Sequence, residues 1–263
     1  MAIKSISLIG AGVMGEALIA ALLKSGVPSN NIFIVEKRKE RCDELVAKYS
    51  ISAQADLRTT DVLLLVVKPQ DLNDVLLEIK GELNPNALVI SFVAGKKIAT
   101  ISEGLSGENA VVRVMPNTPT LISQGAAGYS LGSNVSAEGK DFVIKFLTAA
   151  GLAVEVDEKF QDAVTATSGS GPAYFFAFVE AMIAGAKQLG LSENDATKLA
   201  TQTFVGAAKL LEETGKSATT LRENVTSPNG TTAAALASFQ SAKLNDIVAK
   251  AMKAAHDRSI ELG

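Results

Sequence analysis

The sequence is poor in the residues from which catalytic, metal and aromatic binding sites are built. Its 263 residues include no tryptophan, one cysteine and one histidine, and aromatic residues make up 5%. The single cysteine, Cys42, excludes an internal disulfide and fits a reducing compartment. It lies in a helical pattern rich in Lys, Arg and Glu, which favours a structural or surface role over a catalytic thiol. His256 lies between Asp257 and Arg258 and is interpreted as a surface or helix-end residue, not a general acid or base.

Further absences narrow the class of protein. A net charge of −3 gives no general attraction to nucleic acid or anionic membranes. No segment reaches the roughly 18 consecutive apolar residues of a membrane span. A glycine turn interrupts the first apolar segment, so a signal peptide is not expected. The sequence shows no ligand cluster with metal spacing, no nucleophile elbow and no Walker lysine, and no metal is expected. These absences predict a soluble cytoplasmic protein.

Three spaced glycines follow the first apolar run. Residues 6–9 lead into Gly10-x-Gly12-x-x-Gly15, and a helical pattern continues to about residue 23. In a strand–turn–helix, Gly10 permits the tight turn, Gly12 lets the backbone approach a pyrophosphate, and Gly15 allows close helix packing. The alternative is a glycine-rich turn in an α/β protein without a nucleotide. The dinucleotide contacts predicted here are Gly10, Ala11, Gly12, Val13, Met14 and Gly15.

The end of the next expected strand, at 31–36, bears on the choice of coenzyme. An acid at this point binds the ribose 2′-hydroxyl of NAD, whereas basic residues accommodate the 2′-phosphate of NADP. The sequence offers both, because Glu36 is followed by Lys37 and Arg38. An ordinary solvated helix start is the alternative. The pattern favours NADP slightly and leaves NAD open.

Apolar runs at 61–67, 87–93 and 110–115 predict buried strands of a mostly parallel sheet. Ligands bind at the carboxyl ends of such strands, so the residues that follow them are candidates for the site. The first run ends at Lys68, a candidate contact or a surface lysine. The last ends in a Pro-Asn-Thr-Pro turn around Asn117, which is either the rim of the site or a plain turn.

The pattern changes after residue 156. Short strands at 126–131 and 152–156 flank a helix at about 136–149 and complete a dinucleotide-binding domain, residues 1–156. Residues 157–263 show helical patterns only, at about 158–167, 172–190, 193–214, 217–224 and, in pieces, 230–262. The predicted fold is therefore an α/β Rossmann-type domain followed by an all-α domain. The stretch 173–186 is apolar on too many faces for a helix with one side in water, which predicts pairing with a second chain.

Two stretches of the helical half are rich in Ser, Thr and Gly, at 165–174 and 224–236. Each leads into a helix, where hydroxyls and free backbone N–H groups form a natural receptor for a carboxylate or phosphate. Helix capping would explain one Ser or Thr in each place. A dehydrogenase of alcohols also needs a side chain to take the hydroxyl proton, and none is evident. Reduction of a C=N bond needs less, because an iminium nitrogen already carries the charge that attracts hydride.

At this point a family resemblance is evident. The chain resembles the pyrroline-5-carboxylate reductases over nearly its whole length. The resemblance lies in the glycine motif at 10–15 and in the stretches 67–70, 112–119, 168–174 and 221–232, of which the last is the family signature. It implies hydride transfer from NADPH, or alternatively NADH, to the ring C=N of 1-pyrroline-5-carboxylate, giving L-proline. It also implies a homodimer formed by the helical domain, with larger rings of dimers such as a decamer as an alternative.

The resemblance also implies roles for individual residues. The signature loop would hold the substrate carboxylate, and the Thr232 hydroxyl would act in catalysis by hydrogen-bonding the ring nitrogen. Asn229 stands where the family usually has a glycine, and asparagine tolerates a left-handed backbone well. The implied substrate contacts are Ser227, Asn229, Gly230, Thr231 and Thr232. The implied cofactor contacts beyond the glycine loop and the 36–38 segment are Val67, Lys68, Pro69, Ala94 and Asn117.

Two alternatives stay open. A related β-hydroxyacid dehydrogenase would carry a catalytic lysine one turn after a Gly-rich helix start, but here 171–175 is apolar. A non-catalytic protein that only binds NADPH would have no use for the hydroxyls of Ser227, Thr231 and Thr232.

Overall fold

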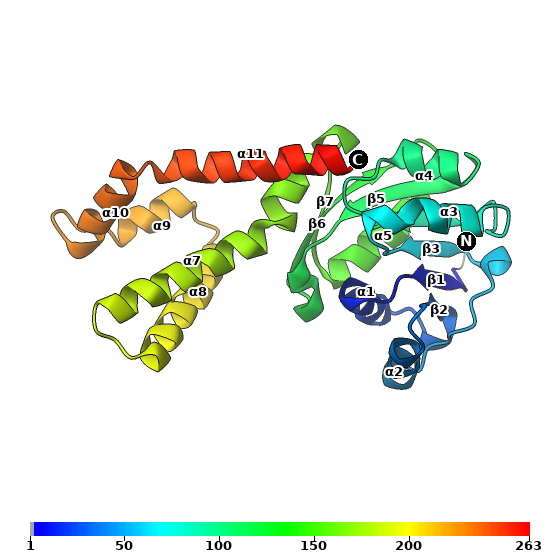
Figure 1. Ribbon diagram of the computed structural model, residues 1–263, viewed down its shortest axis with the longest axis horizontal. Helices are drawn as coiled ribbons and strands as arrows, with labels where there is room; N and C mark the ends of the chain where they lie inside the picture. Colours follow the sequence, from blue (N-terminus) through cyan, green and yellow to red (C-terminus); the bar gives the residue numbers. More distant parts are fainter. Residues whose placement is uncertain (1–2) are drawn as a thin grey trace. The chain divides into compact units, whose positions relative to one another are not determined.

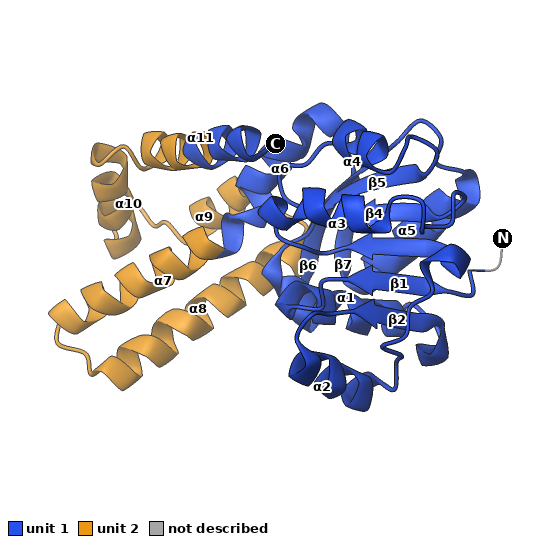
Figure 2. Cartoon of the chain, turned by 45° about the vertical axis from the view of Figure 1, so that its right-hand side comes forward, with its two compact units in different colours: residues 1–172, 254–263 blue, residues 173–253 orange. Residues whose placement is uncertain are grey.

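A computed structural model describes residues 3–263 of the chain. These residues form two compact units, which we call unit 1 (1–172 and 254–263) and unit 2 (173–253) (Figure 2). Unit 1 contains the sheet, and unit 2 is made of helices. The expected division of the chain at residues 156 and 157 stays a prediction.

Seven strands form one sheet in the part of the chain that the structure describes (Figure 1). Their order is β2-β1-β3-β4-β5-β6-β7. The first five are parallel, β6 runs antiparallel to β5, and β7 is parallel to β6. The expected strands are thus confirmed, with small shifts of their ends. The strands are β1 (Ile6–Ile9), β2 (Ile32–Val35), β3 (Val62–Leu65), β4 (Leu88–Ser91), β5 (Ala110–Met115), β6 (Gly125–Leu131) and β7 (Gly151–Glu155).

Helices cover both faces of the sheet, which explains the continuous apolar runs of the central strands. In β3, Leu64 belongs to one buried cluster, whereas Leu63 and Leu65 belong to the other, as the period of two requires. The first cluster includes side chains of α1 (Val13–Lys24), α2 (Lys39–Tyr49) and α5 (Ala137–Ala149). The second includes side chains of α3 (Leu72–Ile79) and α4 (Ile98–Gly104). Both faces of the strands are therefore buried, as in doubly wound folds.

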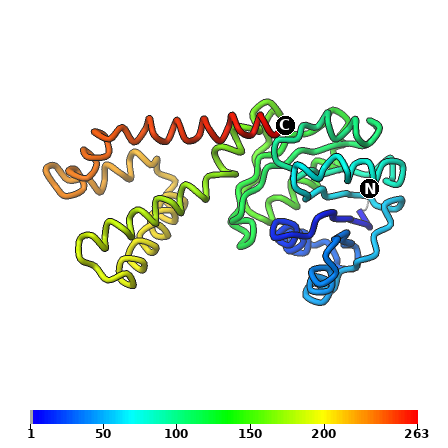
Figure 3. The backbone as a smooth tube through the Cα atoms, in the orientation of Figure 1, coloured from blue at the N-terminus to red at the C-terminus, as the bar shows by residue number. Residues whose placement is uncertain are grey.

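The segments after β7 are helical, as expected, and Figure 3 follows their path along the chain. Ser192 caps α8 by accepting the Asp195 amide at 3.1 Å, which confirms the expected helix start. One expected helix, at 158–167, is less regular: the short α6 passes into a π-helical turn. The helices are α6 (Gln161–Val164), the π-turn (Thr165–Gly169), α7 (Gly171–Gln188), α8 (Glu193–Thr214), α9 (Ala218–Asn224), α10 (Thr231–Ser241) and α11 (Leu244–Leu262).

The last turns of α11 return to unit 1. Ser259 is 3% exposed, and its hydroxyl donates to the Asp162 carboxylate at 2.7 Å. A side chain on Gly95 would collide with the backbone of this turn, which shows how closely the turn approaches the loop after β4. Among residues 3–263, no helix is long and apolar enough to cross a membrane.

Candidate active site

The glycine loop connects β1 to α1 at the carboxyl edge of the sheet. Gly10 has φ +94°, a left-handed value that favours glycine, and its amide donates to the Val35 carbonyl at 3.1 Å. A Cβ on Gly10 would lie 2.7 Å from the Val66 carbonyl oxygen. Gly12 is the N-cap of α1 and makes no side-chain cap bond. The first turn of α1 thus presents its N–H groups without a side-chain acceptor, as phosphate binding at a helix N-terminus requires.

The segment after β2 contains an acid that is already engaged by a base. The Glu36 Oε1 accepts the Arg38 amide and the Arg38 Nε, both at 3.0 Å, and Oε2 accepts from Nη2 at 3.2 Å. The Glu36 side chain is 8% exposed, whereas that of Arg38 is 64% exposed. The Arg38 guanidinium lowers the pKa of Glu36, so this carboxyl is ionised and paired at neutral pH. Lys37 is exposed, and its Nζ lies 3.8 Å from the Glu78 Oε1.

The remaining predicted cofactor residues follow the other parallel strands. Val67, Lys68 and Pro69 follow β3, Ala94 follows β4, and Asn117 follows β5. Because β1 to β5 are adjacent and parallel, all of their carboxyl ends meet at one edge of the sheet. The fold therefore brings these residues to the same edge as the glycine loop. Lys68 is exposed, while Asn117 is buried.

One contact of the glycine loop was not predicted from the sequence. Arg41, on α2, donates from Nε to the Ala11 carbonyl at 3.2 Å. It also binds Glu16 on α1 and Glu44 on its own helix. The charge-rich pattern of 37–48 indicates a solvated helix but does not tell which arginine folds back onto the loop, because that depends on how α1 and α2 pack. Cys42 is partly buried beside the core, as a structural cysteine would be.

The predicted substrate residues lie in unit 2, at the start of α10. Asn229 has φ +59°, so asparagine adopts the left-handed conformation at the position where glycine was expected. The Gly230 amide donates to the Ser227 carbonyl at 3.1 Å, which closes the turn. Gly230 is the N-cap of α10 and makes no side-chain cap bond. The left-handed Asn229 is thus compatible with a tight turn that presents a helix N-terminus.

Three hydroxyls at the start of α10 are not engaged by the described part of the protein itself. Within residues 3–263, Ser227, Thr231 and Thr232 make no side-chain hydrogen bond. The contrast with other helix starts is clear, because Ser136, Ser192 and Ser217 all cap their helices with their hydroxyls. Capping therefore does not account for the hydroxyls around the start of α10, whereas it does account for those at the starts of α5, α8 and α9.

The other hydroxyl-rich stretch, 165–174, is different. The Thr165 hydroxyl donates to the Gln161 carbonyl at 3.0 Å, and the Ser168 hydroxyl donates to the Val164 carbonyl at 3.1 Å. Two of its hydroxyls are thus engaged within the helix. Anion binding by this stretch stays a prediction with less support than for the loop before α10.

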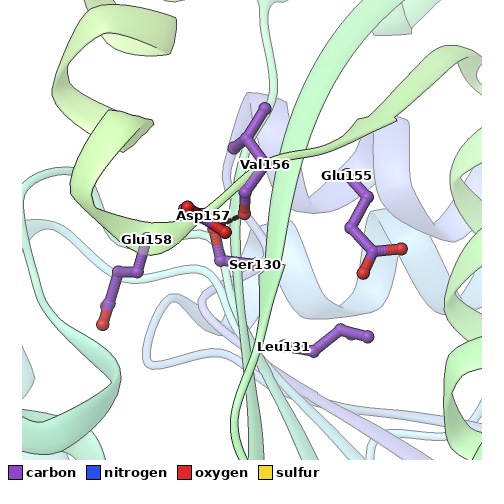
Figure 4. A pocket seen from close by; sticks show the side chains of 6 residues that line it. All are labelled: Ser130, Leu131, Glu155, Val156, Asp157 and Glu158. Atoms are coloured by element: carbon purple, nitrogen blue, oxygen red, sulfur yellow. Dashed lines mark hydrogen bonds between the residues drawn. The ribbon is translucent and has the colours of Figure 1, made fainter.

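A hollow beside β6 and β7 offers no convergent chemistry. In Figure 4, Glu155 and Glu158 lie on opposite sides of the hollow, and the Ser130 hydroxyl donates to the Val156 carbonyl at 2.7 Å. Glu155 binds Lys140 at 2.7 Å, and Glu158 accepts the Ile98 amide at 2.6 Å. These carboxylates are therefore engaged elsewhere. Among residues 3–263, no group of three His, Cys, Asp or Glu side chains is arranged to hold a metal ion. His256 lies in α11, with Nδ1 3.2 Å from Asp257.

Comparison with known proteins extends this picture to both parts of the chain. The family model for pyrroline-5-carboxylate reductase dimerisation matches residues 158–262. The model described as NADP oxidoreductase, coenzyme F420-dependent, matches residues 5–95. The chain is 41% identical over 266 residues to the pyrroline-5-carboxylate reductase of Corynebacterium melassecola, with 98% of each chain covered.

Solved structures are similar over the whole length. A pyrroline-5-carboxylate reductase from Coxiella burnetii is 34% identical, with a TM-score of 0.91 and 99% of both chains covered. A pyrroline carboxylate reductase from Plasmodium falciparum, solved with NADP bound, is 30% identical. Its TM-score is 0.87, with 99% of this chain and 98% of that chain covered.

Proposed function

The chain belongs to the pyrroline-5-carboxylate reductase family, and we propose that its Ser227–Thr232 loop holds the substrate while the sheet edge holds the coenzyme. It is an NADP-dependent oxidoreductase that reduces 1-pyrroline-5-carboxylate to L-proline. The observation that supports this division of roles is that the hydroxyls of Ser227, just before α10, and of Thr231 and Thr232, in its first turn, are not engaged by the residues that the structure describes. They lie beside an uncapped helix N-terminus, which is the chemistry that a small carboxylate requires.

NADPH, when bound, supplies the hydride for the ring C=N bond. Two features fit the coenzyme. The start of α1 has no side-chain cap, and Gly10 leaves a close backbone approach open where a side chain would collide with Val66. In the proposed site, Lys68 and Asn117 lie beside the nicotinamide end, with Val67, Pro69 and Ala94 around them. Ser227, Thr231 and the N–H groups after Asn229 hold the substrate carboxylate. The Thr232 hydroxyl oxygen accepts the N–H of the protonated ring nitrogen and orients the imine for hydride transfer.

The Glu36–Arg38 pair supports a preference for NADPH over NADH. Because both Glu36 oxygens accept from Arg38, they are poorly placed to accept a ribose 2′-hydroxyl. The Arg38 guanidinium is largely exposed and is free to bind a 2′-phosphate with its remaining donors. Lys37 adds a second positive charge in the same segment. Glu36 then acts by orienting Arg38 and does not bind the ribose.

The exposed apolar side chains of unit 2 support a homodimer. Within residues 173–253, all of which the structure describes, only Ala196 and Ala200 are buried. Large apolar side chains of α7 and α8 are exposed in the single chain, among them Phe176 at 57% and Leu199 at 59%. A patch of this kind marks an interface. We propose a homodimer in the cytoplasm, with a decamer as the larger alternative.

A steady-state assay tests this function. Turnover of 1-pyrroline-5-carboxylate should be compared with NADPH and with NADH, and kcat/KM should be higher with NADPH. Arg38→Ala should remove most of that preference, whereas Lys4→Ala, far along the chain from the 36–38 segment, should keep it. Turnover of a β-hydroxyacid without proline formation would contradict the function. An unchanged preference in Arg38→Ala would contradict only the coenzyme assignment.

A further inference from the structure

The π-turn, Thr165–Gly169, is an irregularity that the reaction has not so far explained. Such turns are rare and often lie at functional sites. Here the Ser170 amide donates to the Thr165 carbonyl, five residues earlier, at 2.8 Å. The turn overlaps the Ser-Gly-Ser-Gly-Pro stretch, 168–172, that leads into α7, and it packs on Met115 at the end of β5. A Cβ on Gly169 would lie 2.5 Å from the terminal methyl of Met115, which shows how closely the two approach.

The carbonyl of Ser168 lacks its ordinary helical donor. In an α-helix it would accept from the amide four residues later, but that residue is Pro172, which has no N–H. Asn117 donates in its place, with 3.1 Å between Nδ2 and the Ser168 oxygen. This hydrogen bond is partly buried, and the Asn117 side chain supplies the donor that Pro172 cannot.

The other end of the Asn117 amide is engaged as well. Its Oδ1 accepts the Ala126 amide at 2.9 Å, and the residue is 9% exposed. One side chain therefore joins the end of β5, the start of β6 and the π-turn. A second buried amide holds the helix before the turn: Gln161 is fully buried and donates to the Ser130 hydroxyl at 2.9 Å.

We propose that Asn117 is a positioning residue, which supplies the donor that Pro172 lacks and thereby holds the π-turn against the carboxyl end of β5. This inference rests on the proposed function, in which the nicotinamide lies at that edge. Although Asn117 lies near the nicotinamide in the proposed site, both ends of its amide are engaged within the protein, so it acts through the turn and contributes little to coenzyme affinity. It differs in this from the glycine loop, whose role is coenzyme binding.

Asn117→Asp is a suitable test, because it keeps the side-chain size and the acceptor for Ala126 but removes the N–H that Ser168 needs. In the enzyme without coenzyme, amide hydrogen exchange at 168–171 should rise about tenfold. The value of kcat/KM should fall about tenfold or more, while the Kd for NADPH changes by less than about threefold.

Asn109→Asp is the matched control. Asn109 is 3% exposed and donates to the carbonyls of Asn84, Pro85 and Ala87 near the start of β5. This variant should lower the melting temperature without raising exchange at 168–171 and without changing kcat. The control thereby separates general destabilisation of the fold from loss of the Asn117–Ser168 hydrogen bond, the tether of the π-turn.

Pro172→Ala gives the rescue. It restores a backbone N–H four residues after Ser168, so Asn117→Asp/Pro172→Ala should recover at least about fivefold in kcat/KM over Asn117→Asp, with exchange reduced in parallel. A double variant no better than Asn117→Asp would overturn the inference. So would a rise in the NADPH Kd that matches the activity loss with exchange unchanged. Wild-type turnover in the same assay tests the proposed function separately, since the exchange measurement does not depend on it.

Discussion

The two units bury their apolar side chains to very different degrees. Unit 1 has two buried clusters, one on each face of the sheet. Unit 2 has helices of comparable apolar content but buries almost none of it within the single chain. Its aromatic rings do contact one another. The ring centroids of Phe175 and Phe204 are 5.0 Å apart, in an edge-to-face arrangement. The difference indicates that unit 1 has a core of its own, whereas the exposed apolar side chains of unit 2 are those that the proposed homodimer would cover.

Phe176→Asp should have the largest effect. It places a charge on the exposed apolar face of α7, and burying an unpaired charge in a dimer costs several kcal/mol. The variant should lose the dimer and nearly all activity, as measured by sedimentation and steady-state kinetics. Leu77→Asp is the matched control, since Leu77 is 71% exposed on α3 of unit 1. A Phe176→Asp enzyme that remains dimeric would contradict the proposed interface.

Leu64→Ala tests the other side of the comparison. Leu64 is fully buried in the central strand β3, so truncation should cost about 2–5 kcal/mol of unfolding free energy. The loss should be independent of protein concentration if the core of unit 1 is complete within one chain. Denaturant unfolding at two concentrations measures this, with Leu77→Ala as an exposed control. A concentration-dependent loss would mean that unit 1 also depends on the partner.

Thr232→Ala separates the roles of the units. Loss of one hydrogen bond to the charged imine should raise the barrier by about 1.5–3 kcal/mol, roughly 10- to 150-fold in turnover. NADPH binding, which we assign to unit 1, should be unchanged in a fluorescence titration. Thr226→Ala is the control, because the Thr226 hydroxyl already donates to the Arg222 carbonyl at 2.6 Å. A parallel loss of NADPH affinity would refute the catalytic role of Thr232.

Acid sensitivity gives the smallest expected effect. Lys48 and Arg41 lower the pKa of Glu16 from 4.5 to about 2. A lowered carboxyl pKa adds stability above pH 4.5, and this stability is lost as the pH falls towards 2. Allowing for solvent screening at Lys48, Glu16→Gln should cost about 1–2 kcal/mol at pH 7 and nothing near pH 2. Unfolding between pH 2 and 7 measures this, with the exposed Glu78→Gln as control. An equal loss at both pH values would contradict the assigned cause.

The strands and most helices were predictable because their signals are local. Continuous apolar runs predicted β3, β4 and β5, and the helical pattern at 193–214 predicted α8. The candidate coenzyme residues could be grouped because carboxyl ends of parallel strands share an edge. The tether from Asn117 to Ser168 was not predicted, since it joins residues 51 positions apart. Arg41 was missed for the same reason: its fold-back onto Ala11 depends on helix packing, which the sequence pattern does not encode.

The return of α11 has a consequence for how this protein can be divided. Residues 254–263 complete unit 1, and the Ser259 hydroxyl there donates a hydrogen bond to the Asp162 carboxylate. Unit 2 is therefore an insertion between two pieces of the nucleotide-binding body. A fragment ending at Pro172 would uncover the surface that Ser259 shields. A minimal stand-alone unit 1 would therefore need the final ten residues linked back to residue 172.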